Sequence, residues 1–295
     1  MKNYRLLFFV AFIVILIFPT LSYSQDHNKY PFQSGENMEL TVHYKWGVSS
    51  DIALISFTFN EVKEANQAPY YHLKAYGSTF KFWDSFFKVR DVYESKFTVK
   101  GIKPLYFHRD INEGGYTAKN WYTWGTSSDD MRAIVDKKGK VRIDTIYNIG
   151  HQIYDIVTFF YKIRTLDYKE LEAGKSFPFT VAIDRNLIDI SVRMEKKENK
   201  KIEGLGTFKT IKLAIKVKPR KIDSNTKEDD SRFGIGTNSN DELFDGEEKI
   251  FVWMSDDQNR LPLYFMSPVS IGSVNGRISK YKGVKYPLTS LIQLK

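Results

Sequence analysis

The sequence has 295 residues, a formal net charge of +9 at pH 7 and no cysteine. The lack of cysteine excludes thiol catalysis, disulfide bonds and thiolate metal ligands. The length is enough for one large domain with a substantial hydrophobic core.

The first 24 residues have the features of a signal peptide. Lys2 and Arg5 form a positive n-region, Leu6–Phe18 is an apolar run of 13 residues, and Ser22-Tyr23-Ser24 offers small residues for a signal peptidase. The alternative, an uncleaved membrane anchor, would need a longer apolar run to cross a bilayer. The sequence therefore predicts a signal peptide at residues 1–24 and one mature domain at residues 25–295.

The mature chain is expected in the periplasm or associated with the outer membrane. Export without disulfide bonds fits a Gram-negative periplasm, and a chain without cysteine has no lipid-attachment residue, so it is not expected to be a lipoprotein. Removal of Lys2 and Arg5 lowers the net charge to +7. Because the basic residues are dispersed and the protein is exported, nucleic acid is not an expected partner, whereas weak attraction to anionic lipid or glycan surfaces remains open.

Alternating apolar and polar residues predict an antiparallel sheet of about a dozen strands. Met38–Trp46 alternates most clearly, and the short gaps between segments favour hairpins over parallel crossovers. The other predicted strands are Ile52–Val62, Tyr70–Tyr76, Val89–Phe97, Pro104–Asn112, Tyr116–Trp124, Ala133–Asp136, Val141–Tyr147, Ser176–Ile183, Leu187–Lys196, Lys201–Lys218, Lys249–Met254, Leu263–Ser267 and Ser273–Tyr281.

One helix interrupts these strands. Within Tyr147–Gly174, apolar residues recur at helical spacing, which predicts a buried amphipathic helix over about residues 150–165. Gly174 is placed to end it with a left-handed cap. The segment Ile250–Met254 and the segment Leu261–Met266 are apolar on both faces, which predicts a curved sheet or partly open barrel whose concave side the helix fills.

Two further segments lack such periodicity. Phe80–Phe87 is crowded with aromatic residues and is interpreted as a core plug in preference to a lid that contacts a ligand. Residues 223–245 are polar and rich in Gly, Asn, Ser and acidic residues, which predicts a mobile surface loop. The acidic residues of that loop lack the ligand spacing of a calcium-binding loop.

Five segments in order resemble the exported bacterial family called domain of unknown function 3108, in the form found in Bacteroidetes. They are VRDVYES (Val89–Ser95), DIVTFFYKIR (Asp155–Arg164), GTFKTIKL (Gly206–Leu213), WMSDDQNRLPLYF (Trp253–Phe265) and IGSVNGRISKYKGVKYPLTSLI (Ile271–Ile292). The resemblance covers nearly the whole mature chain. It implies an all-β, barrel-like envelope domain and supplies no catalytic residues.

The search for catalytic motifs is negative. The sequence contains no nucleophile elbow, zinc-binding His-Glu motif or phosphate-binding loop. No two of the five histidines lie within four residues of each other, and His43, on the polar face of its strand, is interpreted as solvated. Arg90, Asp91 and Glu94 are interpreted as cross-strand ion pairs in preference to a catalytic carboxylate pair. No cofactor or metal is expected.

Three classes of function remain open. The first is a binding protein that holds a lipid or another apolar small molecule in the concave sheet, with candidate ligand contacts at Trp46, Phe80, Trp83, Trp121, Tyr154, Phe159, Phe160 and Trp253. The second is a non-enzymatic assembly or interaction protein with a solid core and an envelope protein partner. The third, an envelope hydrolase that uses the carboxylates, has the least support because the sequence proposes no reaction.

Overall fold

A computed structural model describes residues 30–46, 48–125, 130–183, 186–219, 249–269 and 272–294. All the described helices and strands lie in the unit Pro31–Lys295. The predicted signal peptide and the predicted loop at residues 223–245 lie outside the described residues.

The described residues form 16 strands in one sheet. The strands are β1 (Glu36–Trp46), β2 (Val48–Val62), β3 (Tyr70–Thr79), β4 (Arg90–Thr98), β5 (Pro104–Glu113), β6 (Tyr116–Trp124), β7 (Asp130–Lys137), β8 (Lys140–Asn148), β9 (Ile153–Asp155), β10 (Phe177–Ile183), β11 (Asn186–Ile202), β12 (Gly206–Pro219), β13 (Lys249–Ser255), β14 (Pro262–Pro268), β15 (Ser273–Lys282) and β16 (Leu291–Leu294).

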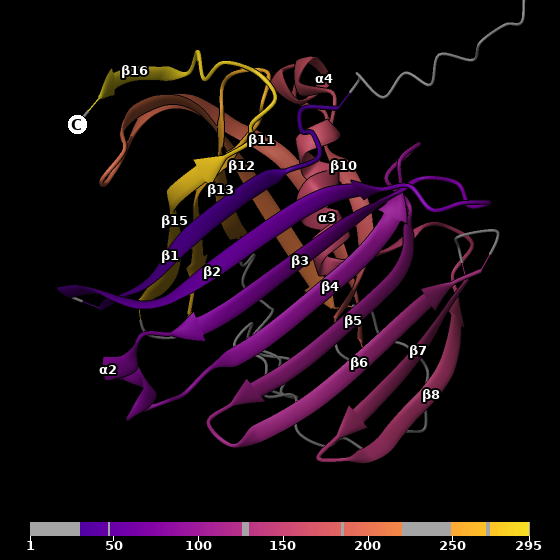
Figure 1. Ribbon diagram of the computed structural model, residues 1–295. Coiled ribbons are helices and arrows are strands. Elements are labelled where there is room, and N and C mark those ends of the chain that lie inside the picture. The colour runs from indigo at the N-terminus through magenta and orange to yellow at the C-terminus, as the bar shows by residue number, and fades with distance from the viewer. Residues whose placement is uncertain are drawn as a thin grey trace, which may run out of the picture. The chain divides into compact units, whose positions relative to one another are not determined.

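The sheet runs in the order β8-β7-β6-β5-β4-β3-β2-β1-β15-β14-β13-β12-β11-β10-β9, with β16 paired to β12. All neighbouring strands are antiparallel except β9 and β10. The early and late strands join where β1 pairs with β15. Strands β8 and β9 form the two edges of the path, so the sheet is open, and the predicted mainly β, partly open architecture is confirmed (Figure 1).

The helical segments are shorter than predicted. They are α2 (Lys81–Asp84), α3 (Ile156–Lys162), the 3₁₀ turn η2 (Ile163–Thr165) and α4 (Tyr168–Glu172). The buried helix near residues 150–165 is present, but it begins at Ile156, because residues 153–155 pair with β10 as a short strand. Gly174 has the predicted positive φ, yet it ends α4 and not one continuous helix.

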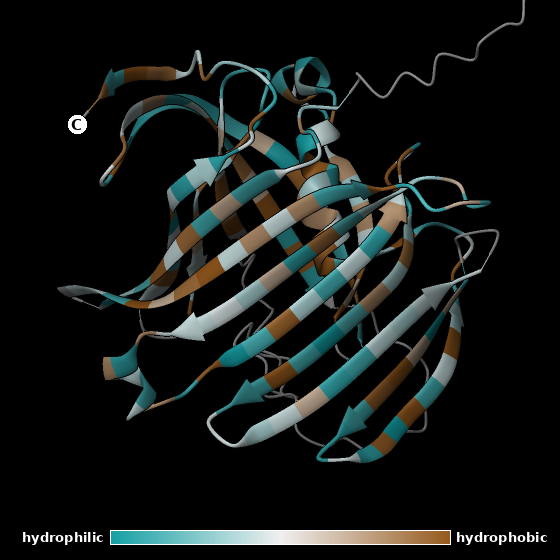
Figure 2. Ribbon diagram, in the orientation of Figure 1, coloured by the Kyte–Doolittle hydropathy of each residue, from teal (hydrophilic) through white to brown (hydrophobic). Residues whose placement is uncertain are grey.

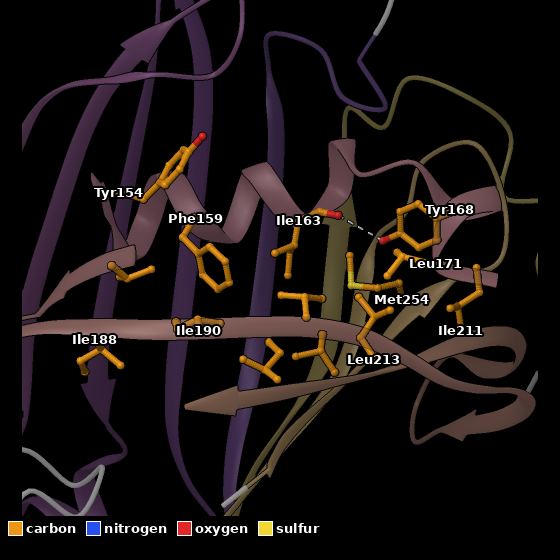
Figure 3. Packing of buried hydrophobic residues seen from close by; sticks show 14 residues of the cluster. Tyr154, Phe159, Ile163, Tyr168, Leu171, Ile188, Ile190, Ile211, Leu213 and Met254 are labelled. Atoms are coloured by element: carbon orange, nitrogen blue, oxygen red, sulfur yellow. Dashed lines mark hydrogen bonds between the residues drawn. The ribbon is translucent and has the colours of Figure 1, made fainter. Parts of the chain in front are cut away.

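Helix α3 crosses the concave side of the sheet. It contacts β3 and β4 on one side and β9 and β10 on the other (Figure 1). Tyr154, Phe159 and Ile163 face the apolar side chains of β11, β12 and β13 in one buried cluster (Figure 3). Along the strands apolar and polar residues alternate (Figure 2), which is the pattern of a sheet with one face on a core.

Strand β13 is buried on both faces, as predicted, and the helix covers only one of them. Val252 and Met254 join the inner cluster, while Trp253 on the opposite face is also buried. The Nζ atom of Lys200 lies 4.1 Å from the centre of the Trp253 ring, and that of Lys212 lies 5.2 Å from it. Lysine side chains and the neighbouring strands, in addition to the helix, therefore exclude water from this part of the sheet.

Candidate functional site

The first turn of α3 is held by a buried carboxylate. Asp155 is the N-cap: one oxygen accepts hydrogen bonds from the backbone N–H groups of Val157 and Thr158 at 2.9 and 2.8 Å. Its other oxygen accepts from the hydroxyls of Thr158 and Ser95 at 2.7 and 3.1 Å. Burial raises the pKa of Asp155 to about 6, and these hydrogen bonds limit the rise. Ser95 belongs to β4, so the cap ties the helix to the sheet.

The last turn is held by a buried ion pair. The Arg164 guanidinium donates to both oxygens of Glu36 at 2.5 and 2.9 Å, and both side chains are fully buried. Tyr161 donates to Glu36 at 2.8 Å, and the carbonyl oxygen of Asn259 accepts from Arg164 at 2.9 Å. Burial opposes the charged form of Arg164, but the Glu36 carboxylate more than offsets it, so the pKa of Arg164 is raised.

These two anchors attach the helix to the sheet at both of its ends. One ties it to β4, and the other ties it to the first residue of β1 and to the turn after β13. Moving the helix away from the sheet would expose or separate buried charged groups, each at a cost of several kcal/mol. Helix α3 is therefore a fixed filler of the concave side rather than a movable gate.

The predicted ligand-contacting aromatics do not form one site. Tyr154 and Phe159 come together in the buried cluster, and Phe160 stacks on Phe57 of β2 with ring centroids 5.1 Å apart. Trp121 stacks on His108 instead, with centroids 5.3 Å apart.

The other four predicted contacts lie elsewhere. Trp253 meets Tyr264 edge-to-face. Phe80 and Trp83 lie at α2, between β3 and β4. Trp46 belongs to β1, and its side chain lies outside the described residues. Of the eight predicted contacts, therefore, Tyr154, Phe159 and Phe160 are the ones that lie together at α3.

The segment around α2 is a rigid turn. Asp84 accepts from Thr79 at 2.5 Å and forms a paired contact with Arg90 at 3.0 and 2.6 Å. The Trp83 indole N–H donates to the carbonyl oxygen of Asp51 in β2 at 2.8 Å. These bonds join both ends of the turn to each other and to the sheet, so its shape is set before any partner arrives.

The same turn exposes its phenylalanines. Phe82, Phe86 and Phe87 are 69%, 72% and 53% exposed, and Phe80 is 39% exposed. The interpretation of this segment as a core plug is therefore wrong: Phe82 packs against Trp83 and Phe86 within the turn, and the rings do not enter the core. Contiguous exposed aromatics are unusual on a monomeric protein and mark surfaces that contact another molecule. The segment 80–87 is called the aromatic turn below.

At this end of the sheet, Arg90, Asp91 and Glu94, interpreted from the sequence as cross-strand ion pairs, have separate partners, and Arg90 pairs with Asp84. Glu94 contacts His72 at 2.6 Å, whereas Asp91 accepts from the backbone N–H of Asn112 at 3.0 Å and hydrogen-bonds Glu113. Burial, then the neighbouring Asp91, raises the pKa of Glu113 to about 7. Burial also raises the pKa of Asp91, so this pair takes up a proton more readily than exposed carboxylates do. Sequence spacing missed Glu113 because it lies on the neighbouring strand.

His43 is buried, so its interpretation as a solvated residue is also wrong. Its Nε2 atom lies 3.3 Å from the Tyr264 hydroxyl, and burial, then the charge of Arg277, lowers the pKa of the imidazole. Within the described part of the chain, no group of three or more His, Cys, Asp or Glu residues could hold a metal ion. No helix there is both long and apolar enough to span a membrane.

An open antiparallel sheet that bends around a short, anchored helix defines a β-barrel-like class of protein. The family model described as protein of unknown function DUF3108 matches residues 39–279, and the chain belongs to this family. The resemblance found in the sequence is thus confirmed. A search of curated proteins gives no significant match.

Several solved structures are similar to this chain at low identity. A β-barrel-like protein of domain of unknown function DUF1849 from Brucella abortus has a TM-score of 0.48 and 8% identity, covering 86% of this chain and all of its own. A candidate lipoprotein from Parabacteroides distasonis has a TM-score of 0.36 and 9% identity, covering 86% and 99%. An exported protein with a YmcC-like fold from Bacteroides fragilis has a TM-score of 0.35 and 8% identity, covering 86% and 98%.

Proposed function

We propose that this protein is a non-enzymatic lipid-binding protein of the cell envelope, and that it contacts lipid through the aromatic turn. The observation that carries the proposal is the cluster of exposed phenylalanines at residues 80–87 on a turn that hydrogen bonds hold rigid. A preformed surface of this kind binds without the entropic cost of ordering a loop.

An envelope location is supported by the amino-terminal sequence. The positive n-region, the apolar run and the small residues before position 25 together direct export. The chain has no cysteine, so our proposal puts it in the periplasm or at the outer membrane as a protein that is not a lipoprotein.

The concave side of the sheet was the first candidate for a lipid site. Fixed anchoring of α3 at Asp155 and at Arg164 argues against a helix that swings aside to admit a ligand. The burial of Tyr154 and Phe159 in the core cluster leaves these rings occupied by protein contacts. We therefore propose that the lipid is bound at the aromatic turn and not on the concave side of the sheet.

The composition of the turn favours a lipid surface over a soluble apolar ligand. Exposed Lys81 and Lys88 flank the phenylalanines, and Trp83 is half-buried at the base of the turn. Aromatic rings between lysines are typical of segments that enter the headgroup region while the cations meet anionic lipid. A turn that projects from the end of a hairpin suits a flat surface, whereas a small apolar ligand needs a concave one.

Vesicle flotation of residues 25–295 tests this proposal. We expect the protein to float with vesicles of phosphatidylethanolamine and phosphatidylglycerol. The double variant Phe82→Ser/Phe86→Ser should bind at least tenfold more weakly, because insertion of one phenylalanine ring contributes about 2 kcal/mol.

A matched control uses two apolar residues that are equally exposed on β8. Val141 and Ile146 are 63% and 68% exposed, and the variant Val141→Ser/Ile146→Ser should float like the wild type. If the wild type does not float, or if both double variants lose binding equally, the proposal is wrong.

The second candidate is an assembly protein that uses the same turn to bind an envelope protein. The specific observation in its favour is the ordered hydrogen bonding of the turn, which suits a defined protein surface as well as a membrane. A photo-crosslinker at position 82 separates the two. Crosslinks to lipid support the main proposal, and crosslinks to one protein in place of lipid support the alternative.

A further inference from the structure

A cleft lies on the outer face of the sheet, opposite the side that α3 fills. Strands β11 and β12 form a long hairpin whose end, at Lys200–Glu203, reaches back over β1, β14 and β15. Glu203 in this end contacts Arg277 of β15 at 3.4 Å. The hairpin end therefore covers the outer face and explains why His43 is buried on a strand face that the sequence marks as polar.

The cleft has two adjoining hollows of about 240 and 450 Å³, and Lys200 and Tyr264 line both. The larger hollow is within the size range of small-molecule sites. The name outer cleft denotes the space bounded by His43, Lys45, Lys200, Trp253, Tyr264 and Arg277.

Positive charge in the larger hollow is not balanced by carboxylates: Lys45 and Lys200 line it and no acidic residue among the described residues does, whereas Glu203 lines the smaller hollow. Arg277 is neutralised by Asp51, to which it donates two hydrogen bonds of 2.6 and 2.8 Å. Lys45 and Lys200, in contrast, have no carboxylate within ion-pair distance among the described residues. Two cations that line the larger hollow without a carboxylate beside them attract an anion from solution.

Lys200 is the central group. Its Nζ atom lies 4.1 Å from the ring centres of both Trp253 and Tyr264. Burial lowers the pKa of Lys200, and the nearby charges of Lys212 and Lys45 lower it further, against the opposing effect of Glu198. An anion that entered here would relieve this repulsion, so its binding energy would come chiefly from the cations already in place.

We infer that the outer cleft binds a phosphoryl group carried by a larger polar molecule, with Lys45 and Lys200 as its cationic contacts. Lysine is a common point-charge partner for phosphate, and the doubly charged phosphoryl group matches two lysines better than a carboxylate does. The larger hollow exceeds the size of phosphate alone, and the half-buried side chains of Tyr264 and Met266 line it beside the lysines, where the body of the ligand would lie. This inference does not depend on the aromatic turn.

Calorimetric titration with inorganic phosphate tests the cationic contacts. We expect saturable binding to the wild type, at least tenfold weaker binding to Lys200→Met and to Lys45→Met, and no change for Lys74→Met. Lys74 is an exposed lysine of β3 away from the cleft. Methionine keeps the apolar stem that covers the rings, and Lys45 has no such packing role, so one variant remains informative if the other is unstable.

A second titration distinguishes a free phosphate compound from a lipid headgroup. Vesicles that contain phosphatidylglycerol are compared with vesicles of phosphatidylcholine alone, using Phe82→Ser/Phe86→Ser as the background in order to remove the aromatic contact. Binding that depends on Lys200 and phosphatidylglycerol identifies a lipid phosphate, and Lys200-dependent binding of inorganic phosphate without such vesicle binding identifies a soluble one. The inference is overturned if the wild type binds neither probe, or if Lys200→Met and Lys74→Met behave alike.

Discussion

The buried pair of Glu36 and Arg164 offers the sharpest test of the fixed helix. Both side chains are fully buried, and the two oxygens of Glu36 accept from the two terminal nitrogens of Arg164. Glu36→Gln would leave the guanidinium charge without its counterion in a site closed to water. Removal of one partner of a buried ion pair typically costs about 3–5 kcal/mol, and we expect this loss in the free energy of unfolding.

The reverse change, Arg164→Met, leaves the Glu36 carboxyl group with a hydrogen bond from the Tyr161 hydroxyl. Because a carboxyl group can take up a proton, we expect this variant to recover stability at low pH, whereas Glu36→Gln should not. The double variant removes both charges, and its cost should fall at least 1.5 kcal/mol below the sum of the single costs, as is typical of coupled residues.

Urea unfolding of residues 25–295 at pH 5 and pH 7, followed by tryptophan fluorescence, measures all four proteins. Hydrogen exchange at the amides of α3 in the wild type adds a test of movement. The fixed helix would be refuted if each single variant lost less than 1 kcal/mol of unfolding free energy, or if the losses were additive in the double variant. Hydrogen exchange in α3 much faster than in β12 would also refute it, and would support a movable gate.

Three further predictions concern the cap and two close contacts. For Asp155→Asn we expect the free energy of unfolding to change less between pH 4 and 7 than in the wild type, as measured by urea unfolding. Burial raises the carboxyl pKa from 3.8 to about 6, so protonated Asp155 stabilises the fold below pH 4, and about 3 kcal/mol of that stability is lost as pH rises through 6. Gly276→Ala should cost about 1–3 kcal/mol by thermal denaturation, because its Cβ would lie 1.9 Å from the Phe265 ring, and Phe265→Leu should relieve part of that cost. Gly114→Ala would place a Cβ 2.5 Å from the Phe87 ring at a φ of +53°, so vesicle binding should weaken by displacement of that ring, and unchanged flotation would contradict the packing of the turn.

The sequence predicts the strands well because the pattern that marks each strand lies within that strand and its turns. Alternation along Met38–Trp46 marks which side chains face the core, and the Gly114-Gly115 turn marks a hairpin that the structure contains, with positive φ at both glycines. Such signals are local, so a single chain suffices to read them.

The start of the helix could not be predicted in this way. Ile153 fits either a strand or a helical face, and only the distant strand β10 makes residues 153–155 extended. Asp155 then caps the helix at the point where the strand ends. The sequence offers an N-cap residue there, but the apolar periodicity continues across it and obscures the boundary.

The candidate surfaces are long-range features and were missed for that reason. Glu36 and Arg164 are 128 positions apart, and Lys200 and Lys45 approach the same cleft only because the β11–β12 hairpin folds over the sheet. Aromatic spacing at residues 80–87 cannot tell an exposed ring from a buried one. Exposure there depends on the hydrogen bonds that Asp84 accepts and on the one that the Trp83 indole donates to Asp51, and sequence spacing does not identify these partners.

The aromatic turn and the outer cleft are connected by one residue. The carbonyl oxygen of Asp51 accepts from the Trp83 indole, and its carboxylate holds Arg277 at the edge of the cleft. Because α3 is anchored at both ends, the sheet that carries the aromatic turn and the outer cleft is not expected to open or close around a ligand. Binding on such a scaffold must use surfaces that are already formed, and Asp51 fixes the position of both: displacement of Trp83 by lipid would act directly on the residue that neutralises Arg277.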